Sequence, residues 1–499
     1  MIGLYLGCDS SALANTRKEF EELHDSKKLP QWISTEGEVV YHQDIDTSKA
    51  FCDIQGHHCL VVSGWFSYKD NVNDTTSLFK DLCQQGEAAL KNITGGIFIA
   101  LFASKEHYFV FNDPMGLSNH FYTTHENDLR IAPSITVFER SDLKLDVNDK
   151  LMGFLMKRGH LFGNFTKYNQ VKRLSPGCIL YKDGCSKTYF SALYTNTLPM
   201  EQILNRFTTI INKFPKEKRQ LPITGGLDSR LMLCAAEFNF GYCYGPADSA
   251  DRPIARQFSQ EFQEFIEFEF GSTNKNGNEI SIYEELCETP AQMIKAEFLA
   301  SYRYAHTQCK SANITFDGFL GGSLQRGAWL HLGGILGELY RFFPYLYTIR
   351  PITARTLLKR RYKNLTSEEF ELFFENFVEK TEHVDLDDYA KVTYYEFLWG
   401  RGARFINNGA LIINGQFGQI VPMFSDPIVF NSLISQDFRK TIRYQTVCNI
   451  WGSVDEKFKR VKFENGYKIS TPNVIKPKIS LIWRLLSRYV PGFGNYGNS

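Results

Sequence analysis

The sequence has no long apolar run and no surplus of charge of either sign. No stretch of about 18 uninterrupted apolar residues occurs, so a membrane-spanning helix is not expected. The 56 Lys and Arg side chains nearly equal the 55 Asp and Glu side chains, which gives no whole-chain electrostatic case for binding nucleic acid. The first residues lack the positive region of a signal peptide and include Asp9. We therefore expect a cytoplasmic protein with no membrane span and no nucleic-acid partner.

The eleven cysteines include no CxxC pair and no CxxH cluster. Their spacing is that of neither a zinc site nor a disulfide framework. We expect most of them to be reduced and to pack as small hydrophobic side chains.

At 499 residues the chain is long enough for two or more domains. Up to about residue 190, short apolar runs broken by Gly, Asn, Asp and Pro predict an antiparallel sheet: "CLVVSGWFSY", "GGIFIALFAS", "HYFVFND", "HFYTT" and "LRIAPS". The segment "DTTSLFKDLCQQGEAALKNI" has helical apolar spacing after a capping candidate. We therefore predict an α+β domain over residues 1–190.

From about residue 200, predicted strands alternate with predicted helices. The strands are "RQLPIT" and "FGYCYG", and the helices are "MEQILNRFTTIINKF", "DSRLMLCAAEF" and "DRPIARQFSQEF". Such alternation predicts a parallel, doubly wound sheet. After residue 285 helical patterns dominate, including "TYYEFLWGRGARFINNGALI" and roughly the last sixty residues. Residues 200–499 form the second predicted domain.

The stretch "LPITGGLDSRLM" joins a predicted strand to a predicted helix through two glycines. Backbone N–H groups at such a helix N-terminus lack intrahelical partners and attract an anion. Gly225 and Gly226 allow close backbone approach, and Thr224 and Ser229 add hydroxyl donors. Asp228 is a candidate to hold magnesium against phosphates. The pattern is neither the Walker loop nor GxGxxG, so these residues alone indicate either a phosphate-binding loop or a capped glycine turn.

The same string closely resembles the SGGxDS pyrophosphate loop of the N-type ATP pyrophosphatases, in particular the SGGLDS loop of the asparagine synthetase family. Thr224 stands where the family has Ser. The following "YGPADSADRPIARQFSQEFQEFIEFEF" is similar to the family's second strand and helix, which implies that Tyr244 and Gly245 line an adenine pocket. The resemblance implies an ATP site built by Ile223, Thr224, Gly225, Gly226, Leu227, Asp228 and Ser229.

Other segments extend the resemblance, with gaps, over most of the chain. "GGIFIALFASKEHYFVFNDPMGLSNHFYTT" resembles the family's glutaminase-type domain, including a turn that contains Asn112 and Asp113. "GHLFGNFTKYNQVKRLSPGCIL" resembles the connecting segment, and "IVPMFSDPIVFNSLIS" the PFLD stretch. The implied fold is an Ntn-type (class II glutaminase-like) α+β sandwich domain followed by an α/β N-type ATP pyrophosphatase domain (adenine nucleotide alpha hydrolase-like) with a helical C-terminal part.

The N-terminus departs from the family. A working glutaminase of this family has a cysteine directly after the initiator Met, and this chain has Ile2. We therefore expect no glutamine hydrolysis and an inactive glutaminase-like domain. Cys8 is expected to be a core thiol rather than a nucleophile.

A second departure concerns the metal. "TFDGFLGGSLQRGAW" aligns with the family's SGxGxDExxxGG element, and Gly322 and Ser323 stand where an Asp that holds magnesium and a Glu are expected. Asp228 is left as the clear metal ligand, and magnesium remains an expected cofactor because it keeps much of its hydration. The resemblance also places Asp317 and Gly318 against the nucleotide.

A basic segment near the C-terminus supplies the last candidates. Adenylate-forming members of the family have an R-x-K whose Lys reaches the α-phosphate, and "KRVKFENGYK" offers Arg460 and Lys462. We predict Lys462 as the catalytic lysine. The alternatives are Lys468, Lys476 and Lys478, or a solvated basic helix for all of them. Arg401 and Arg404 are candidates to hold a second carboxylate.

Two functions follow from the resemblance. The first is an ATP-dependent amide-bond-forming ligase that activates a small-molecule or peptide carboxylate as an acyl-adenylate, with ammonia or an amine as the nitrogen donor. The second is a non-catalytic asparagine synthetase homologue that binds nucleotide or a partner protein. Ile2, Gly322 and Ser323 favour the second function, and the intact "TGGLDS" string favours the first.

Overall fold

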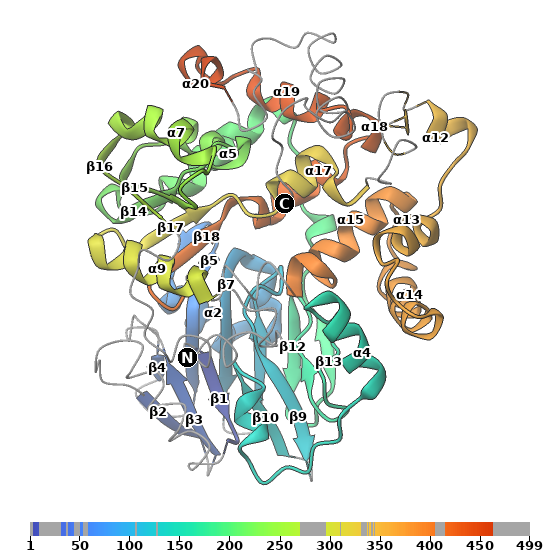
Figure 1. Cartoon of the computed structure of the whole chain (residues 1–499). Coiled ribbons are helices and arrows are strands. Elements are labelled where there is room, and N and C mark those ends of the chain that lie inside the picture. The colour runs from blue at the N-terminus through green and yellow to red at the C-terminus, as the bar shows by residue number, and fades with distance from the viewer. Residues whose placement is uncertain are drawn as a thin grey trace.

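The computed structural model describes most of the chain, in three sheets and the helices around them (Figure 1). The described residues are 3–8, 31–35, 38–43, 50–52, 58–104, 107–125, 128–269, 296–309, 311–330, 337, 339–340, 343, 345–404 and 415–462. Ile2, Lys468, Lys476 and Lys478 lie outside these ranges.

The first two sheets are antiparallel and use the N-terminal part of the chain. The first has the order β11-β9-β10-β1-β3-β2 and the second β13-β12-β8-β7-β5-β4, with β6 paired to β5. The strands of the first are β1 (Gly3–Leu6), β2 (Gln31–Thr35), β3 (Glu38–Gln43), β9 (Phe121–His125), β10 (Asp128–Ala132) and β11 (Lys172–Arg173). Those of the second are β4 (Ala50–Cys52), β5 (Cys59–Tyr68), β6 (Asn71–Val72), β7 (Ile93–Ala103), β8 (Tyr108–Asn112), β12 (Cys178–Tyr181) and β13 (Ser186–Thr188).

Side-chain alternation along β5 and β7 explains how these sheets stack. Val61 and Ile99 belong to a buried cluster with Leu4 and Ile131 of the first sheet. The adjacent side chains point to the opposite face and pack on helix α2 (Thr75–Gln85) in a separate cluster. Asp74 caps that helix by accepting from the Ser77 N–H, as the sequence predicts. The result is two stacked sheets with a helix on the outer face of one.

The predicted turn at Asp113 is held by buried polar contacts. The Asp113 carboxylate is fully buried and accepts from the backbone N–H groups of Met115, Leu117 and Ser118 at 2.8 to 3.1 Å. Burial raises the pKa of this carboxyl, and the three N–H groups oppose that rise. The Asn112 side chain donates to the Ser175 carbonyl at 2.8 Å. These residues therefore join the turn to the segment before β12.

The third sheet is parallel throughout. Its order is β16-β15-β14-β17-β18, formed by β14 (Arg219–Pro222), β15 (Phe238–Gly245), β16 (Phe262–Glu269), β17 (Ile314–Asp317) and β18 (Gln419–Pro422). The predicted strand and helix alternation is confirmed from β14 to β16, where α6 (Leu227–Ala235) and α7 (Asp251–Ala255) make the crossovers. The sequence patterns did not indicate β17 and β18, which are four residues each.

Apart from α3 (Thr136–Glu139) and α4 (Asp149–Arg158), which lie in the antiparallel part, the remaining described α-helices surround this sheet and extend to one side of it (Figure 1). They are α5 (Ile203–Ile211), α9 (Ala296–Gln308), α10 (Gly321–Arg326), α12 (Leu346–Ile349), α13 (Ala354–Arg361), α14 (Ser367–Thr381), α15 (Asp388–Leu398), α17 (Pro427–Ile434), α18 (Phe438–Thr441), α19 (Gln445–Trp451) and α20 (Glu456–Arg460). The last three are short, and the basic residues after 462 lie outside the described part.

The helix predicted from "TYYEFLWGRGARFINNGALI" is interrupted, because α15 ends at Leu398 and helical backbone resumes only at 401–404. The carboxylate of Glu396 accepts from the Arg401 N–H at 2.9 Å and lies where a side chain on Gly400 would be. Gly400 also has a low intrinsic helix propensity. The segment 405–414 of this predicted helix lies outside the described residues.

Buried contacts join the antiparallel part to the parallel part. The Trp65 indole N–H donates to the Ile420 carbonyl at 2.7 Å. The buried Arg404 guanidinium donates to the carbonyls of Gly163 and Phe165 at 3.0 and 2.8 Å. This assigns Arg404 to packing between the two parts, in place of the role in holding a carboxylate that the sequence suggested.

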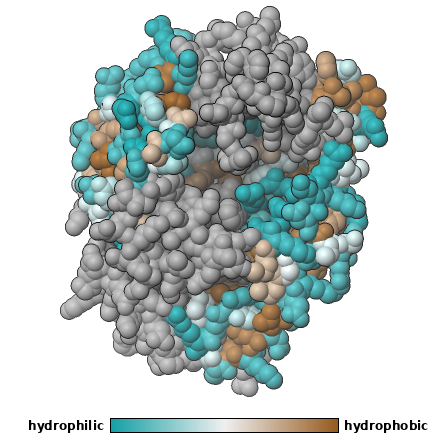
Figure 2. All heavy atoms as spheres, in the orientation of Figure 1, coloured by the Kyte–Doolittle hydropathy of each residue, from teal (hydrophilic) through white to brown (hydrophobic). Residues whose placement is uncertain are grey.

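Among the coloured residues of Figure 2, an apolar patch lies at the upper right, over α12. Its exposed large side chains are Leu339, Phe343, Tyr345 and Ile349. Of the helices that the structure describes, none has the length and apolar character needed to cross a membrane.

Candidate functional site

The parallel sheet contains a point where the strand order reverses. From β14 the chain adds β15 and β16 on one side and then returns to add β17 and β18 on the other. Strands β14 and β17 pair only near their starts, at Arg219 with Ile314 and Gln220 with Thr315. In open parallel sheets, such a switch point forms a crevice at the carboxyl ends of the strands. The predicted loop follows β14 and the segment 318–320 follows β17, so both lie at the carboxyl edge of the sheet, where such a crevice is expected.

The loop after β14 is organised by its own hydroxyl groups. Ser229 Oγ accepts from the Thr224 N–H at 3.1 Å, and Thr224 Oγ1 accepts from the Gly226 N–H at 3.1 Å. Gly226 is the N-cap of α6 and has no side chain to cap it. An uncapped helix N-terminus carries partial positive charge. The loop therefore directs an electropositive helix end into the crevice.

A carboxylate from the next strand contacts this loop. Asp251 lies at the start of α7, beyond the end of β15, and its Oδ1 accepts from the Gly225 N–H at 2.8 Å. A Cβ on Gly225 would lie 2.7 Å from that oxygen, so only glycine permits the approach. The Gly225 N–H therefore already holds an anionic oxygen.

Asp228 lies in the first turn of α6, with its carboxylate held by two side chains from α10. Oδ1 accepts from Gln325 Nε2 at 2.7 Å, and Oδ2 pairs with Arg326 Nη2 at 3.1 Å. Burial raises the pKa of Asp228, while Arg326 and Gln325 oppose the rise. Gln325 is fully buried, whereas the side chains of Asp228 and Arg326 keep 19% and 20% of their surface exposed, enough for a ligand to reach them.

The segment after β17 lies directly against α6. A Cβ on Gly318 would lie 3.0 Å from Asp228 Cβ, and one on Gly321 would lie 2.7 Å from Asp228 Cγ. Between them, Leu320 adopts φ 67°. This left-handed turn places Gly318 and Gly321 in contact with the Asp228 side chain.

Asp317, at the end of β17, is a buried carboxyl. Its Oδ1 accepts from the Phe319 N–H at 2.8 Å. Burial raises the pKa of Asp317 to about 7, and the nearby Asp228 carboxylate adds to the rise. Asp317 is therefore a carboxyl that changes charge near neutral pH.

Tyr244 and Gly245 lie at the carboxyl end of β15, beside β14. The Tyr244 hydroxyl donates to the hydroxyl of Tyr302 on α9 at 3.1 Å, and its ring stacks on Phe268 with a centroid distance of 5.7 Å. The described geometry thus places an aromatic group at the strand end where the sequence predicts an adenine pocket.

Lys462 reaches the loop through Arg230. The Arg230 guanidinium is fully buried and donates to the carbonyls of Gly225 and Lys462 at 3.3 and 3.2 Å. Lys462 itself is exposed. The structure therefore brings the predicted nucleotide-site residues of the loop, β15 and β17 to one edge of the sheet, and Lys462 to a segment bonded to the loop.

A magnesium ion held by protein side chains needs oxygen ligands, which carboxylates usually supply. Within the described ranges, no group of three or more His, Cys, Asp or Glu side chains is placed to hold a metal ion. The Asp228 carboxylate faces a guanidinium, and Gly322 and Ser323 supply no carboxylate. These residues do not fit a carboxylate-held magnesium, so the assignment of Asp228 as a metal ligand stays a prediction that its contacts do not support.

The cysteines whose side chains are described are all free thiols. Cys8 lies two residues beyond β1 and is partly buried, and its Sγ donates to the carbonyls of Leu6 and Ile131 at 3.4 and 3.2 Å. Its assignment as a core thiol stays a prediction. The Ile2 position lies outside the described residues.

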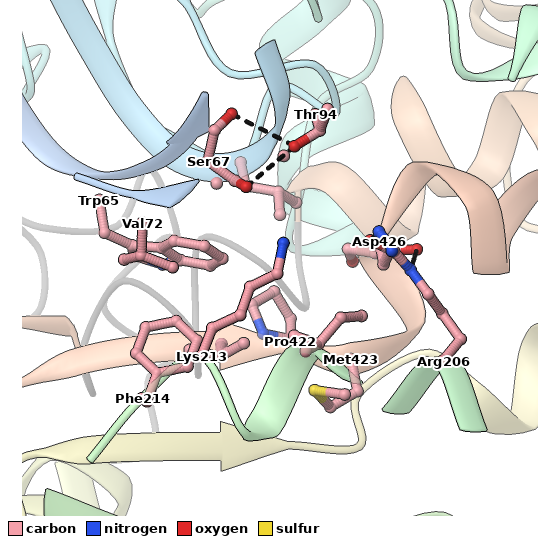
Figure 3. A pocket seen from close by; sticks show the side chains of 16 residues that line it. Trp65, Ser67, Val72, Thr94, Arg206, Lys213, Phe214, Pro422, Met423 and Asp426 are labelled. Carbon is pink, nitrogen blue, oxygen red and sulfur yellow. Dashed lines mark hydrogen bonds and ion pairs between the residues drawn. The ribbon is translucent and has the colours of Figure 1, made fainter. Parts of the chain in front are cut away.

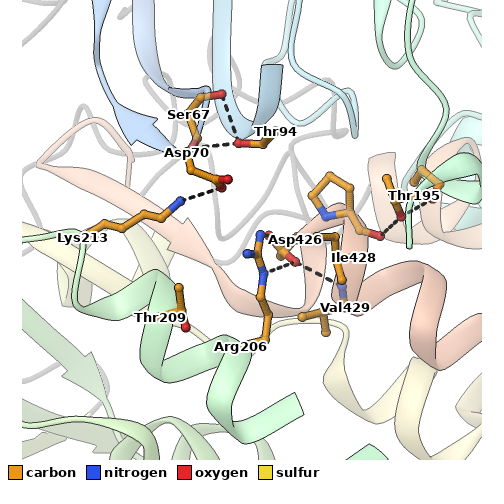
Figure 4. A network of polar contacts seen from close by, with 12 residues as sticks. Ser67, Asp70, Thr94, Thr195, Arg206, Thr209, Lys213, Asp426, Ile428 and Val429 are labelled. Atoms are coloured by element: carbon orange, nitrogen blue, oxygen red, sulfur yellow. Dashed lines mark hydrogen bonds and ion pairs between the residues drawn. The ribbon is translucent and has the colours of Figure 1, made fainter. Parts of the chain in front are cut away.

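A separate pocket opens between the antiparallel and parallel parts (Figure 3). The rings of Trp65 and Phe214 meet edge to face at its wall, with centroids 5.5 Å apart. Arg206 forms an ion pair with Asp426, and Lys213, which also lines the pocket, pairs with Asp70 at 3.2 Å (Figure 4). None of the described residues predicted for the nucleotide site lines this pocket.

Sequence reasoning missed Arg230, Asp251, Gln325 and Arg326. Arg230 stands inside the quoted loop string, and Arg326 inside the quoted "TFDGFLGGSLQRGAW". The bond from Arg230 to Lys462 spans 232 positions and the pair of Arg326 with Asp228 spans 98, so neither contact is visible in the local pattern. No protein-family model and no curated protein matches the sequence.

Proposed function

We propose that this chain is an ATP-dependent amide-bond-forming ligase of the asparagine-synthetase-like type, without glutaminase activity of its own. The observation that carries the proposal is the loop Thr224–Ser229 at the switch point of a parallel sheet, where an uncapped helix N-terminus faces the crevice. Such a terminus favours the phosphates of a nucleotide. The resemblance of "TGGLDS" to the SGGxDS pyrophosphate loop supports ATP as the nucleotide, in an N-type ATP pyrophosphatase domain over residues 200–499.

In the proposed reaction, an oxygen of the substrate carboxylate attacks the α-phosphorus of ATP. The bond from that phosphorus to pyrophosphate breaks, and pyrophosphate leaves onto the loop. An amine nitrogen then attacks the acyl carbon, the bond to AMP breaks, and the amine releases a proton to solvent. Holding carboxylate and ATP together supplies much of the rate. With Ile2 in the nucleophile position, the nitrogen comes from free ammonia, a partner glutaminase or an amine on the substrate.

The proposed roles follow the crevice. Phosphate oxygens replace Asp251 Oδ1 at the Gly225 N–H and Thr224 Oγ1 at the Gly226 N–H, and they bind the Ser229 hydroxyl. Tyr244 and Gly245 border the adenine. Lys462 stabilises negative charge on the α-phosphate, which the bond from Arg230 to the Lys462 carbonyl supports by holding this segment near the loop. Any magnesium ion is proposed to enter the site already bound to the phosphates of ATP.

One observation favours the second candidate, a non-catalytic homologue that binds nucleotide or a partner protein. Asp228 is paired with Arg326, and Gly322 supplies no second carboxylate beside it. If the reaction required a metal ion bound to Asp228, the chain would bind nucleotide without catalysing the reaction. The loop itself is retained in both candidates.

Pyrophosphate release from ATP with magnesium, measured across a pool of candidate carboxylates, separates the two. The ligase predicts release with at least one carboxylate and a loss in Asp228→Ala, and Asp385→Asn, which changes an exposed carboxylate on the loop before α15, serves as the control. If no carboxylate leads to release of pyrophosphate, the ligase proposal is wrong. Added glutamine should yield no glutamate, and hydrolysis that disappears in Cys8→Ala would show that the N-terminal domain is active.

A further inference from the structure

We propose that Arg326 supplies the positive charge that faces a bound polyphosphate at the switch point, so that ATP binding here does not need a magnesium ion held by Asp228. This inference rests on the proposed nucleotide site. Arg326 takes over the electrostatic role of a metal ion, so the affinity for ATP should depend little on removal of magnesium.

The first support is the position of the guanidinium. Arg326 Nη2 lies 3.1 Å from Asp228 Oδ2, and Asp228 is in the first turn of the helix that the glycine loop introduces. The guanidinium therefore lies beside the N-terminus of α6, where an anion is attracted by the helix dipole. Arginine binds phosphate oxygens through a planar fork of N–H donors, so it suits this place.

The second support is the space at Gly322. A Cβ built on Gly322 would collide with Arg326 Nη2. Gly322 does not have the positive φ that would itself demand glycine. The absence of a side chain at 322 therefore makes room for the guanidinium, and the two residues form one arrangement.

The third support is the way in which α10 fixes Asp228. Gln325 Nε2 donates to Asp228 Oδ1 at 2.7 Å while Arg326 engages Oδ2, so adjacent residues of one helix hold both carboxylate oxygens. A divalent cation at this carboxylate would meet the guanidinium as a like charge. The side chains of Asp228 and Arg326 keep 19% and 20% exposure, so the guanidinium is partly exposed to solvent.

The test is calorimetric titration of the full chain with ATP, once with EDTA and once with MgCl2. The wild-type protein should bind ATP in EDTA with an affinity within about threefold of the magnesium value. Arg326→Gln should lose about tenfold or more in EDTA and recover part of the affinity in MgCl2, because the freed Asp228 carboxylate then accepts a cation. Arg326→Lys should keep most of the metal-free affinity.

Controls separate charge from folding. Arg439→Gln removes a guanidinium that pairs with Asp437 on the surface and should leave both affinities unchanged. Asp228→Asn removes the counterion and should keep or strengthen ATP binding in EDTA. Circular dichroism shows whether each variant is folded. If Arg326→Gln does not fold, the ATP affinities of Arg326→Lys and Asp228→Asn in EDTA still test the role of Arg326.

The outcomes are distinct. Wild-type binding in MgCl2 that disappears in EDTA overturns this inference and leaves the proposed function standing. Equal metal-free affinities of folded Arg326→Gln and wild type also overturn it, as does loss of metal-free binding in Asp228→Asn. No ATP binding by the wild type in either buffer overturns the proposed nucleotide site and this inference together.

Discussion

Arg230 donates from its Nη2 to the carbonyl of Lys462 at 3.2 Å, across 232 positions of the sequence. The same guanidinium donates to Gly225 of the glycine loop and to Val461, and it lies 4.9 Å from the centroid of the Phe258 ring. One buried cation thus fixes the loop and the basic segment relative to each other.

Replacing Arg230 should release the basic segment. Arg230→Ala leaves several carbonyls without their charged donor and opens a cavity, so we expect the free energy of unfolding to fall by about 3 kcal/mol. Hydrogen exchange should speed up selectively at residues 456–462. Arg439→Ala, a surface arginine on α18, is the control and should change neither quantity. Unchanged exchange at 456–462 would contradict the bridging role.

Asp317 should make stability fall as pH rises. Its pKa is about 7 in the fold, above the value of about 3.9 in an unfolded chain. Between these values the folded state holds a proton that the unfolded state has lost, so unfolding becomes easier as pH rises through this window. The decline should amount to a few kcal/mol at most.

Asp317→Asn should remove this decline, because the amide oxygen still accepts from Phe319 N–H and carries no charge at any pH. Denaturant unfolding at several pH values between about 4 and 8 measures the difference from wild type. Asp142→Asn, at a mostly exposed carboxylate, is the matched control. A difference that does not change with pH would refute the prediction.

Asp251 should weaken anion binding at the loop. Its Oδ1 accepts from the Gly225 N–H at 2.8 Å and brings negative charge to the place proposed for phosphate. Asp251→Asn keeps an acceptor and removes the charge, so ATP should bind about fivefold more tightly at low salt. Titration calorimetry measures the change, with Asp385→Asn as the surface control. Weaker or equal binding would speak against phosphate at Gly225.

The buried pair of Glu396 and Arg361 should be sensitive to loss of its carboxylate. Glu396 is fully buried. It forms an ion pair with Arg361, whose Nε lies 3.0 Å from Oε1, and it accepts a hydrogen bond from the Tyr362 hydroxyl at 2.8 Å. Glu396→Gln leaves the Arg361 charge uncompensated, which should cost about 3 to 5 kcal/mol in denaturant unfolding.

The matched control is Glu371→Gln, whose partner Arg355 also lies on α13 but on its exposed side. Because exposed pairs contribute little, we expect a change of less than about 1 kcal/mol. Similar losses in the two variants would show that burial does not set the strength of these pairs.

Local sequence determined much of the scaffold. The alternation of β5 and β7, the Asp74 cap of α2 and the strand-loop-helix unit around Gly225 are set by residues close together in the chain, so they were predictable. Strands β17 and β18 were not, because four residues carry too little periodic signal and a long helical region separates them. At the end of α15, the Glu396 carboxylate accepts from the Arg401 N–H, and the apolar periodicity of the sequence does not predict such a contact.

The composition of the crevice was decided by tertiary structure. The sequence indicated the loop from Thr224 to Ser229 because glycine, hydroxyl and helix-start signals lie side by side there. The sequence did not predict that Arg326, 98 positions from Asp228, lies in the space that Gly322 leaves open. Long-range ion pairs form only when the sheet brings its strand ends together, and that packing determines which charge faces a ligand.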